Sequence, residues 1–273
     1  MATISLQDAA DQLGVHYMTV YRYVRHGRLP ARKVGGTWEV DTADLEGLRR
    51  GHDRSVRPRR SADWPDRLQA RLLEGDEAGA WGVVEAALAS GNSPADIYGQ
   101  LLGPAMAAVG EKWHAGEVSV GQEHLATAVV LRLIGRLGPR FARKGRNKGA
   151  VIVTTPPGER HGIPALMLSD LLRGAGFEVI DLGADVPVDA LTEIVGAVDN
   201  LVAVCVSVTR SNLERAARRT VKAVRKADPT VGVFVGGGGV ADSAHAEALG
   251  ADGWARRAEG AVELVLGVLA APQ

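Results

Sequence analysis

Short apolar runs alternate with longer stretches of helical periodicity between residues 148 and 273. The apolar runs predict strands at 150–155, 177–182, 201–207 and 231–235, with a weak fifth near 252–254. The periodic stretches predict helices at 164–175, 187–199, 211–227, 241–249 and 258–269. Alternating strands and helices are typical of a parallel sheet covered by helices on both faces. Residues 148–273 are therefore expected to form a doubly wound, five-stranded α/β domain.

The preceding segment, 64–140, has helical periodicity alone. Its four predicted helices are 65–73, 77–90, 94–113 and 120–137. Ser93 followed by Pro94 is typical of a helix start with proline at the first helical position, and Ser119 with Gln122 forms a capping-box pattern. Apolar residues recur at helical spacing through the third helix, so we expect a four-helix bundle.

Residues 1–51 predict a small module that begins with two short helices. Ser5 and Asp8 form a helix-start pattern before an apolar stripe. Gly14 interrupts this pattern, and a second helix is expected from about Tyr17 to His26. Two short helices separated by a tight turn are typical of a helix-turn-helix.

The same module contains a predicted β-hairpin, or wing. Its strands are 29–34 and 37–40, and they flank the turn residues Gly35-Gly36. A short helix is expected from Thr42 to Arg49. The whole segment is therefore predicted to be an all-α winged helix-turn-helix head, followed by a basic linker over 52–63.

Composition changes this picture only locally. Lys and Arg number 32 and so do Asp and Glu, which gives no net charge, but residues 1–60 carry 11 Lys or Arg against 7 Asp or Glu. The single cysteine, Cys205, excludes a disulfide framework and a cysteine-based zinc site. No apolar run reaches membrane-spanning length and no secretory core is present. We expect a soluble, cytoplasmic protein with no membrane partner.

The candidate chemistry of the α/β domain lies after its strands. Glu159 and His161 follow the first strand, Ser207 and Thr209 follow the third, and Gly236 with Gly237 opens a run of four glycines after the fourth. The carboxyl ends of parallel strands face one crevice, where such sheets bind ligands. Glu159 is placed to hold one ring nitrogen of His161 while the other faces a metal. A lone loop histidine is more often simply solvated, and a glycine run is about as often a turn without a ligand.

Two other readings of this domain lack their residues. A receiver domain needs clustered carboxylates after the first strand, where Thr154-Thr155-Pro156-Pro157 supplies none. A dinucleotide-binding fold needs G-x-G-x-x-G between the first strand and helix, and here the glycines follow the fourth strand.

The far end of the bundle carries a second candidate group. Trp113 and His114 close the third helix, and Glu123 and His124 lie in the first turn of the fourth. A Trp offers a large flat surface, and Glu and His can hydrogen-bond a polar ligand. Spacing alone favours the plainer interpretation, a packed Trp and a solvated His.

The amino-terminal module resembles the winged helix-turn-helix of MerR and excisionase-type DNA-binding domains. The resemblance implies that the second helix enters the major groove of double-stranded operator DNA and that the wing touches the phosphate backbone. The implied DNA-binding residues are Tyr17, Thr19, Arg22, Tyr23, Arg25, Arg32 and Lys33. A protein-interaction module is the alternative. One such module offers little contact area, so a homo-oligomer is implied.

The α/β domain resembles the cobalamin-binding domain shared with methionine synthase, which implies a flavodoxin-like or Rossmann-like fold. The resemblance rests on the motif residues Glu159, His161, Ser207, Thr209, Gly236 and Gly237, in order and at similar spacing. It implies that His161 is the lower axial ligand of cobalt, with the base of the nucleotide tail displaced toward Ser207 and Gly236. Pro164 departs from the pattern, since the family usually has glycine there.

The whole chain is similar to the light-sensing CarH/LitR regulators, which combine a MerR-type head, a helical cap and a cobalamin domain. Trp113, nine residues, then Glu123-His124 matches their cap motif. The resemblance implies that adenosylcobalamin is the cofactor, that Trp113 covers its adenosyl group and that Glu123 hydrogen-bonds it. His124 completes the motif, and His114 matches the residue that takes the upper cobalt position after light expels the adenosyl group.

The sequence therefore predicts a light-responsive transcriptional regulator, most consistent with a repressor, and not an enzyme. It is expected to bind DNA in the dark as a homotetramer, a dimer of dimers, and to dissociate after photolysis of the cobalt–carbon bond. Two alternatives remain open. One is a regulator that senses cobalamin without light, and the other is a corrinoid protein that carries methyl groups between partner methyltransferases.

Overall fold

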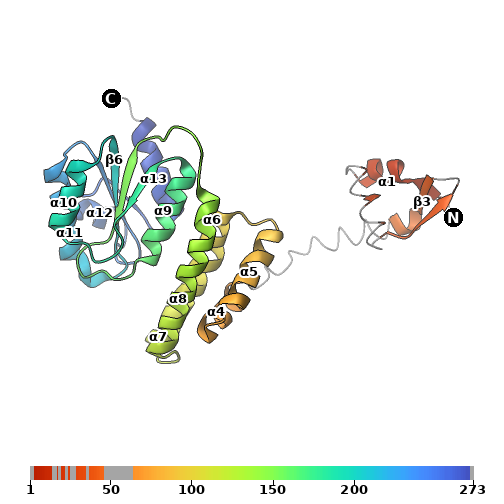
Figure 1. Cartoon of the computed structure of the whole chain (residues 1–273), viewed down its shortest axis with the longest axis horizontal. Coiled ribbons are helices and arrows are strands. Elements are labelled where there is room, and N and C mark those ends of the chain that lie inside the picture. Colours follow the sequence, from red (N-terminus) through yellow and green to blue (C-terminus); the bar gives the residue numbers. More distant parts are fainter. Residues whose placement is uncertain are drawn as a thin grey trace. The chain divides into compact units, whose positions relative to one another are not determined.

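The fold is that of a computed structural model, which forms two compact units, residues 1–63 and 64–273. It describes residues 3–13, 29–34, 37–45 and 64–270, together with Tyr17, Val20, Tyr21 and Val24. Figure 1 shows both units, whose relative positions are not determined.

The amino-terminal unit contains a three-stranded antiparallel sheet beside a helix. Its elements are β1 (Thr3–Ser5), α1 (Leu6–Leu13), β2 (Ala31–Val34) and β3 (Thr37–Asp41), in the strand order β1-β3-β2. Val34 pairs with Thr37, so the predicted hairpin is confirmed. The predicted helix start is confirmed too, because Ser5 Oγ accepts the Asp8 backbone N–H while Ser5 N–H bonds the Asp8 carboxylate. Strand β1 was not predicted, since three residues are too few to show a period.

The second helix of the head lies mostly outside the described residues. Tyr17, Val20, Tyr21 and Val24 are helical, and Val20 is fully buried in the core of this unit. Four of the predicted DNA-contacting residues lie outside the described residues: Thr19, Arg22, Tyr23 and Arg25. The predicted linker over 52–63 lies outside them as well.

The bundle contains α4 (Trp64–Glu74), α5 (Glu77–Ala89), a composite third helix and α8 (Val120–Leu137). The capping box predicted at Ser119 is present, and Ser93 is the predicted N-cap before Pro94, where it also forms a capping box with Asp96. The third helix is not continuous as predicted: α6 (Pro94–Asp96) passes into a π-helix, η1 (Ile97–Leu102), and then into α7 (Gly103–His114). Pro104 has no N–H to offer the carbonyl four residues earlier, and Gly103 bonds instead to Tyr98, five residues back. A widened turn accommodates this shift.

The α/β domain has the predicted doubly wound fold. Its strands are β4 (Ala150–Thr154), β5 (Glu178–Asp181), β6 (Leu201–Ser207), β7 (Gly232–Gly236) and β8 (Gly253–Ala255). The helices are α9 (Ile163–Ala175), α10 (Val188–Ala197), α11 (Glu214–Ala227), α12 (Ser243–Leu249) and α13 (Ala258–Ala270), with short 3₁₀ turns η2 (Gly138–Phe141) and η3 (Ser211–Leu213). All strand pairs are parallel, in the order β5-β4-β6-β7-β8. The order reverses at β4, and such a switch point is where open α/β sheets bind ligands.

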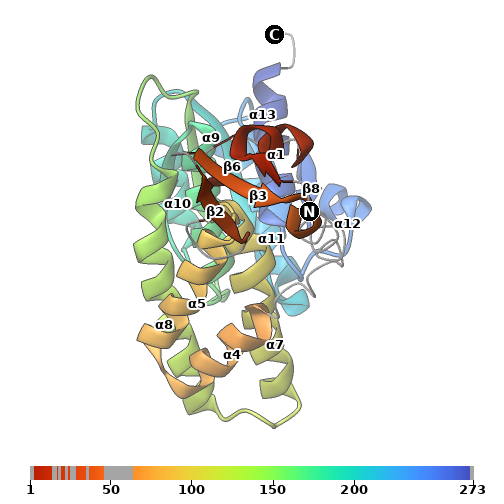
Figure 2. The same cartoon turned by 90° about the vertical axis from the view of Figure 1, so that its right-hand side faces the viewer.

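Helices cover both faces of this sheet. Side chains of α10, α11 and α12 pack on one face, and those of α9 and α13 pack on the other. The bundle lies on the α9 side of the sheet, as Figure 1 shows, and this side of the unit faces the viewer in Figure 2. Met167 and Leu171 of α9 belong to the core of the bundle. The boundary predicted between residues 140 and 148 therefore falls inside one compact unit.

Candidate functional site

The loop after β4 carries the most heavily bonded carboxylate of the α/β domain. Glu159 is fully buried. Its Oε1 accepts the backbone N–H of His161 at 3.1 Å, and its Oε2 accepts the backbone N–H of Thr209 at 2.8 Å and of Arg210 at 3.2 Å. The Thr209 hydroxyl also donates to Oε2, at 2.7 Å. Two loops that follow neighbouring strands, β4 and β6, are thus joined through one side chain.

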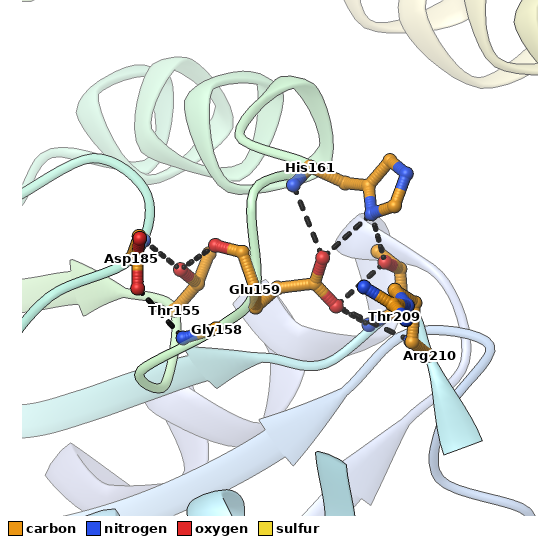
Figure 3. Close-up of polar contacts among 7 residues, drawn as sticks. All are labelled: Thr155, Gly158, Glu159, His161, Asp185, Thr209 and Arg210. Atoms are coloured by element: carbon orange, nitrogen blue, oxygen red, sulfur yellow. Dashed lines mark hydrogen bonds and ion pairs between the residues drawn. The ribbon is translucent and has the colours of Figure 1, made fainter. Parts of the chain in front are cut away.

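The same carboxylate fixes the ring of His161. Its Nδ1 lies 2.6 Å from Glu159 Oε1 and 3.0 Å from Thr209 Oγ1, whose proton is committed to Glu159. Both neighbours are acceptors, so the neutral ring carries its proton on Nδ1. Nε2 then holds a free lone pair. Figure 3 shows it pointing away from the Glu159 contacts, and 60% of the side chain is exposed.

These contacts favour the ionised form of the Glu159 carboxyl group. Burial acts to raise the pKa of its carboxyl group, but the hydrogen bonds from Thr209 and His161 outweigh it, so the pKa is lowered from the usual value. An ionised, fully bonded carboxylate is a strong acceptor for Nδ1–H, and it fixes the tautomer and the orientation of the His161 ring.

A second layer holds the Glu159 backbone. Thr155 Oγ1 donates to the Glu159 carbonyl at 2.9 Å and accepts the Asp185 N–H at 2.8 Å. The Asp185 N–H also reaches the Glu159 carbonyl, and Asp185 Oδ1 accepts the Gly158 N–H at 2.6 Å. Asp185 has φ of +57°, a conformation that short polar side chains tolerate. Sequence reasoning missed Thr155, Asp185 and Arg210. Asp185, which follows Gly183-Ala184 after a strand, was the one with a detectable turn signal.

The glycine run packs against the protein's own backbone. A Cβ on Gly237, whose φ is +98°, would lie 2.5 Å from the Val208 carbonyl oxygen, and one on Gly239 would lie 2.7 Å from that of Arg210. Val208 N–H bonds the Gly236 carbonyl, and Gly239 N–H bonds the Val208 carbonyl. The run therefore braces the loop that presents Thr209 to Glu159.

A pocket of about 70 Å³ opens beside this loop, between α9, β6, β7 and β8. Ser207, Gly236 and Gly237, three of the predicted site residues, line it together with Phe234. Pro164 also lines it and stands in the first turn of α9, where its missing N–H has no intrahelical partner to lose.

The predicted cap residues lie at the end of the bundle. Trp113 is 42% exposed, and its ring lies edge-on to that of His114 with 4.8 Å between the ring centroids. His114 Nδ1 lies 2.7 Å from the Gly110 carbonyl oxygen. His124 Nδ1 lies 2.9 Å from Glu123, which also accepts the Thr127 hydroxyl. Across residues 64–270, no hydrogen bond or ion pair joins these residues to Glu159 or His161. In the head, Arg32 and Lys33 are exposed on β2, and Tyr17 is also exposed.

Comparison with known families agrees with this layout. Two family models, each described as a B12 binding domain, match residues 64–137 and 149–266, and a helix-turn-helix domain matches residues 3–52. The chain thus joins a helix-turn-helix domain to cobalamin-binding regions, which indicate a corrinoid cofactor. No helix within the described ranges has the length and apolarity to span a membrane.

Individual relatives are of two kinds. A corrinoid protein from Desulfitobacterium hafniense is 26% identical over 75% of this chain and 96% of its own length. The HTH-type transcriptional repressor CarH from Myxococcus xanthus is 31% identical over 54% of this chain, and the alignment covers only 50% of that repressor. The solved monomethylamine corrinoid protein of Methanosarcina barkeri has the same fold over 74% of this chain and 96% of its own, with a TM-score of 0.66 and 24% identity.

Proposed function

We propose that this protein is a light-responsive transcriptional repressor that uses adenosylcobalamin and is not a catalyst. The proposal starts from a chain that joins a helix-turn-helix domain to cobalamin-binding regions. The observation that carries the proposal is the combination itself. Three quarters of this chain align with almost the whole length of the D. hafniense corrinoid protein. That corrinoid protein therefore has little room for a DNA-binding head. The head matched at residues 3–52 is thus an addition to the corrinoid-protein architecture.

The residues present fit a corrin-held cobalt. His161 offers one exposed imidazole lone pair, and neutral imidazole suits cobalt. No group of three or more His, Cys, Asp or Glu that could hold a metal occurs among the described residues. A metal at His161 must bring most of its own ligands, as cobalt in a corrin does. We assign His161 as the lower axial ligand, with Glu159 and Thr209 as the residues that fix its ring.

The pocket beside Ser207, Gly236 and Gly237 is the proposed site of the nucleotide tail. Its volume of about 70 Å³ is well below that of typical ligand sites, so its walls must separate to admit the tail. Pro164 is one of those walls and belongs to the first turn of α9, which makes that end of the helix the candidate moving part.

The cap residues are assigned to the upper face. Trp113 would cover the adenosyl group, Glu123 would hydrogen-bond it, with His124 held beside Glu123, and His114 would supply an upper nitrogen ligand once that group is lost. Adenosylcobalamin supplies a weak cobalt–carbon bond that visible light breaks. The exposed indole of Trp113 and the free Nε2 of His114 support these roles, since both remain available to a ligand.

The readout proposed for this change is assembly. In the dark, the cap would favour a homotetramer, built as a dimer of dimers, whose helix-turn-helix heads bind operator DNA together through Tyr17, Thr19, Arg22, Tyr23, Arg25, Arg32 and Lys33. Linked weak heads bind far more tightly than single ones. Loss of the adenosyl group would shift the cap, separate the subunits and release the DNA.

Illumination of the full-length protein loaded with adenosylcobalamin tests this proposal. In the dark we expect a tetrameric elution volume and retardation of the protein's own promoter fragment; green light should change the spectrum, increase the elution volume and abolish retardation. The same protein loaded with methylcobalamin or hydroxocobalamin is the control. Equal assembly with all three forms, in light and dark, would support a light-independent cobalamin sensor instead.

A corrinoid methyl carrier is the second candidate, because the match to the corrinoid protein extends over both cobalamin-binding regions. This candidate predicts that methylcobalamin-loaded protein passes its methyl group to a partner methyltransferase. It also predicts no retardation of promoter DNA in any cofactor state, which separates it from both regulator proposals.

A further inference from the structure

Helix α11 carries a charge pattern that the proposed site does not use. Its 14 residues contain six Arg or Lys and a single acid, Glu214, although the chain as a whole has no net charge. The helix buries Ala217, Thr220, Val221 and Val224 against the sheet. Its apolar side is thus fully engaged by the protein's own core, and its outer side is almost entirely cationic.

Two of the six cations already have partners. Arg218 pairs with Glu214 at 2.8 Å, and Arg225 pairs with Asp252 and donates to the Val231 carbonyl. The other four have no ion pair or side-chain hydrogen bond with any residue of the described part of the chain, and all four are exposed. They are Arg215, Arg219, Lys222 and Lys226, which we call the α11 basic face.

These four side chains form one stripe. Their spacing of four, three and four residues keeps them on one side of an α-helix over a length of roughly 16 Å. Neighbouring α10 contributes the exposed acids Asp189 and Glu193, but neither forms an ion pair with the stripe. α11 lies on the side of the sheet opposite to α9 and the bundle, so the bundle does not cover it (Figure 1).

We propose that the α11 basic face binds the phosphate backbone of DNA, as a second contact surface besides the helix-turn-helix head. A row of unpaired cations on a helix without large exposed apolar side chains fits a regular polyanion better than a lipid surface, which would require an apolar side to insert. Each cation stands roughly 4.5 to 6 Å from the next along the helix axis, within a factor of two of the roughly 3.4 Å between charges along one DNA strand. The inference rests on the proposed function, because DNA held by the head raises the local DNA concentration around the rest of the same chain.

The salt dependence of DNA binding by the full-length, cofactor-loaded protein tests this face. The test variant is the triple substitution Arg215→Gln, Arg219→Gln and Lys222→Gln, and the probe is a labelled duplex of mixed sequence titrated between about 50 and 200 mM salt. We expect the slope of log K against log salt to become shallower by about two to three, since each lost phosphate contact removes roughly 0.9. Restoring charge as lysine at positions 215 and 219 should recover most of the slope.

The matched control neutralises three exposed cations elsewhere, with Arg143→Gln, Lys144→Gln and Arg146→Gln. A change confined to the α11 triple supports the proposal. An equal change of the salt slope in both triple variants overturns it. An unchanged slope in both variants also overturns it, and an acidic protein is then the partner to seek. If the unmodified protein fails to retard the duplex at any salt concentration, the proposed regulatory function fails with it, whereas normal DNA binding with an unchanged slope removes only the second surface. An unchanged corrinoid spectrum of each variant verifies that the α/β domain is folded.

Discussion

At the scale of single residues, the site depends on how one buried carboxylate is satisfied. The Glu159 carboxylate accepts hydrogen bonds from its own loop and from the loop after β6, and it also accepts one from His161 Nδ1. An unpaired buried carboxylate is strongly unfavourable. The arrangement therefore links the stability of both loops to the tautomer of the proposed metal ligand.

Thr209→Val removes a hydroxyl that contacts both Glu159 and His161 while keeping the side-chain volume. The unfolding free energy should fall by about 1 to 3 kcal/mol, the usual effect of deleting a hydrogen bond to a charged group. Denaturant unfolding of the protein without cofactor measures it. Cobalamin affinity should also fall, because the ring of His161 is less constrained. Thr220→Val is the matched control: its hydroxyl bonds only the Ala216 carbonyl, so it should affect stability and leave cobalamin affinity unchanged.

The lowered pKa of Glu159 makes stability depend on pH. The carboxyl group of the unfolded chain titrates near 4.5 and that of the folded chain at lower pH. The stabilisation is therefore fully present above the unfolded pKa and is lost as the pH falls through the folded one. Unfolding free energies measured from about pH 6 down to pH 3 should decrease in this window. Glu159→Gln should flatten the decrease; an identical slope in the variant would mean that other carboxylates cause it.

At the scale of elements, the sheet could be predicted well because its central strands are buried on both faces. Val151, Ile152 and Val153 form an unbroken apolar run of the kind that parallel strands show. Strand β1 escaped prediction because its three residues are too few to show an alternating pattern. The π-helix before Pro104 escaped because hydrophobic spacing alone does not reveal a widened turn.

The candidate site was predictable in part for a related reason. His161, Glu159 and Thr209 have side chains whose chemistry can be read from the sequence, and the order of the strands brings them together. Arg210 contributes only its backbone N–H, and Thr155 and Asp185 act on the Glu159 carbonyl. Backbone groups are the same in every residue, so no motif announces them.

The glycine loop gives a prediction at this scale. Gly237→Ala should destabilise the protein by about 1 to 3 kcal/mol, since an alanine at φ of +98° is strained and its Cβ would meet the Val208 carbonyl oxygen. The displaced loop carries Thr209, so cobalamin affinity should fall as well. Gly238→Ala is the control in the same loop, because its nearest contact is an ordinary 3.5 Å to the Thr209 carbonyl oxygen. Equal effects of the two variants on thermal unfolding and affinity would contradict the bracing role.

At the scale of the whole chain, one buried contact ties the bundle to the α/β domain. Tyr98, in the π-helix of the bundle, is fully buried and donates from its hydroxyl to Asp170 of α9 at 2.6 Å, and Arg173 bonds the other carboxylate oxygen at 3.0 Å. Burial first, and then the hydrogen bond and charge of Asp170, raise the pKa of Tyr98, so it remains a proton donor at all physiological pH values. The Tyr98 ring stacks on Phe141 at the start of the connection to β4.

This contact predicts how the two parts unfold. Tyr98→Phe keeps the stacked ring but leaves one oxygen of the buried Asp170 without its donor, which should destabilise residues 64–273 by about 1.5 to 3 kcal/mol. Because side chains of α9 lie in the core of the bundle, the loss should lower the midpoint of one cooperative transition and leave its denaturant slope unchanged. Circular dichroism of the helices and Trp fluorescence, which includes Trp81 in the bundle and Trp254 in β8, should report the same midpoint in the variant. If the two probes separate, the bundle and the α/β domain are coupled by this hydrogen bond more than by their shared apolar core.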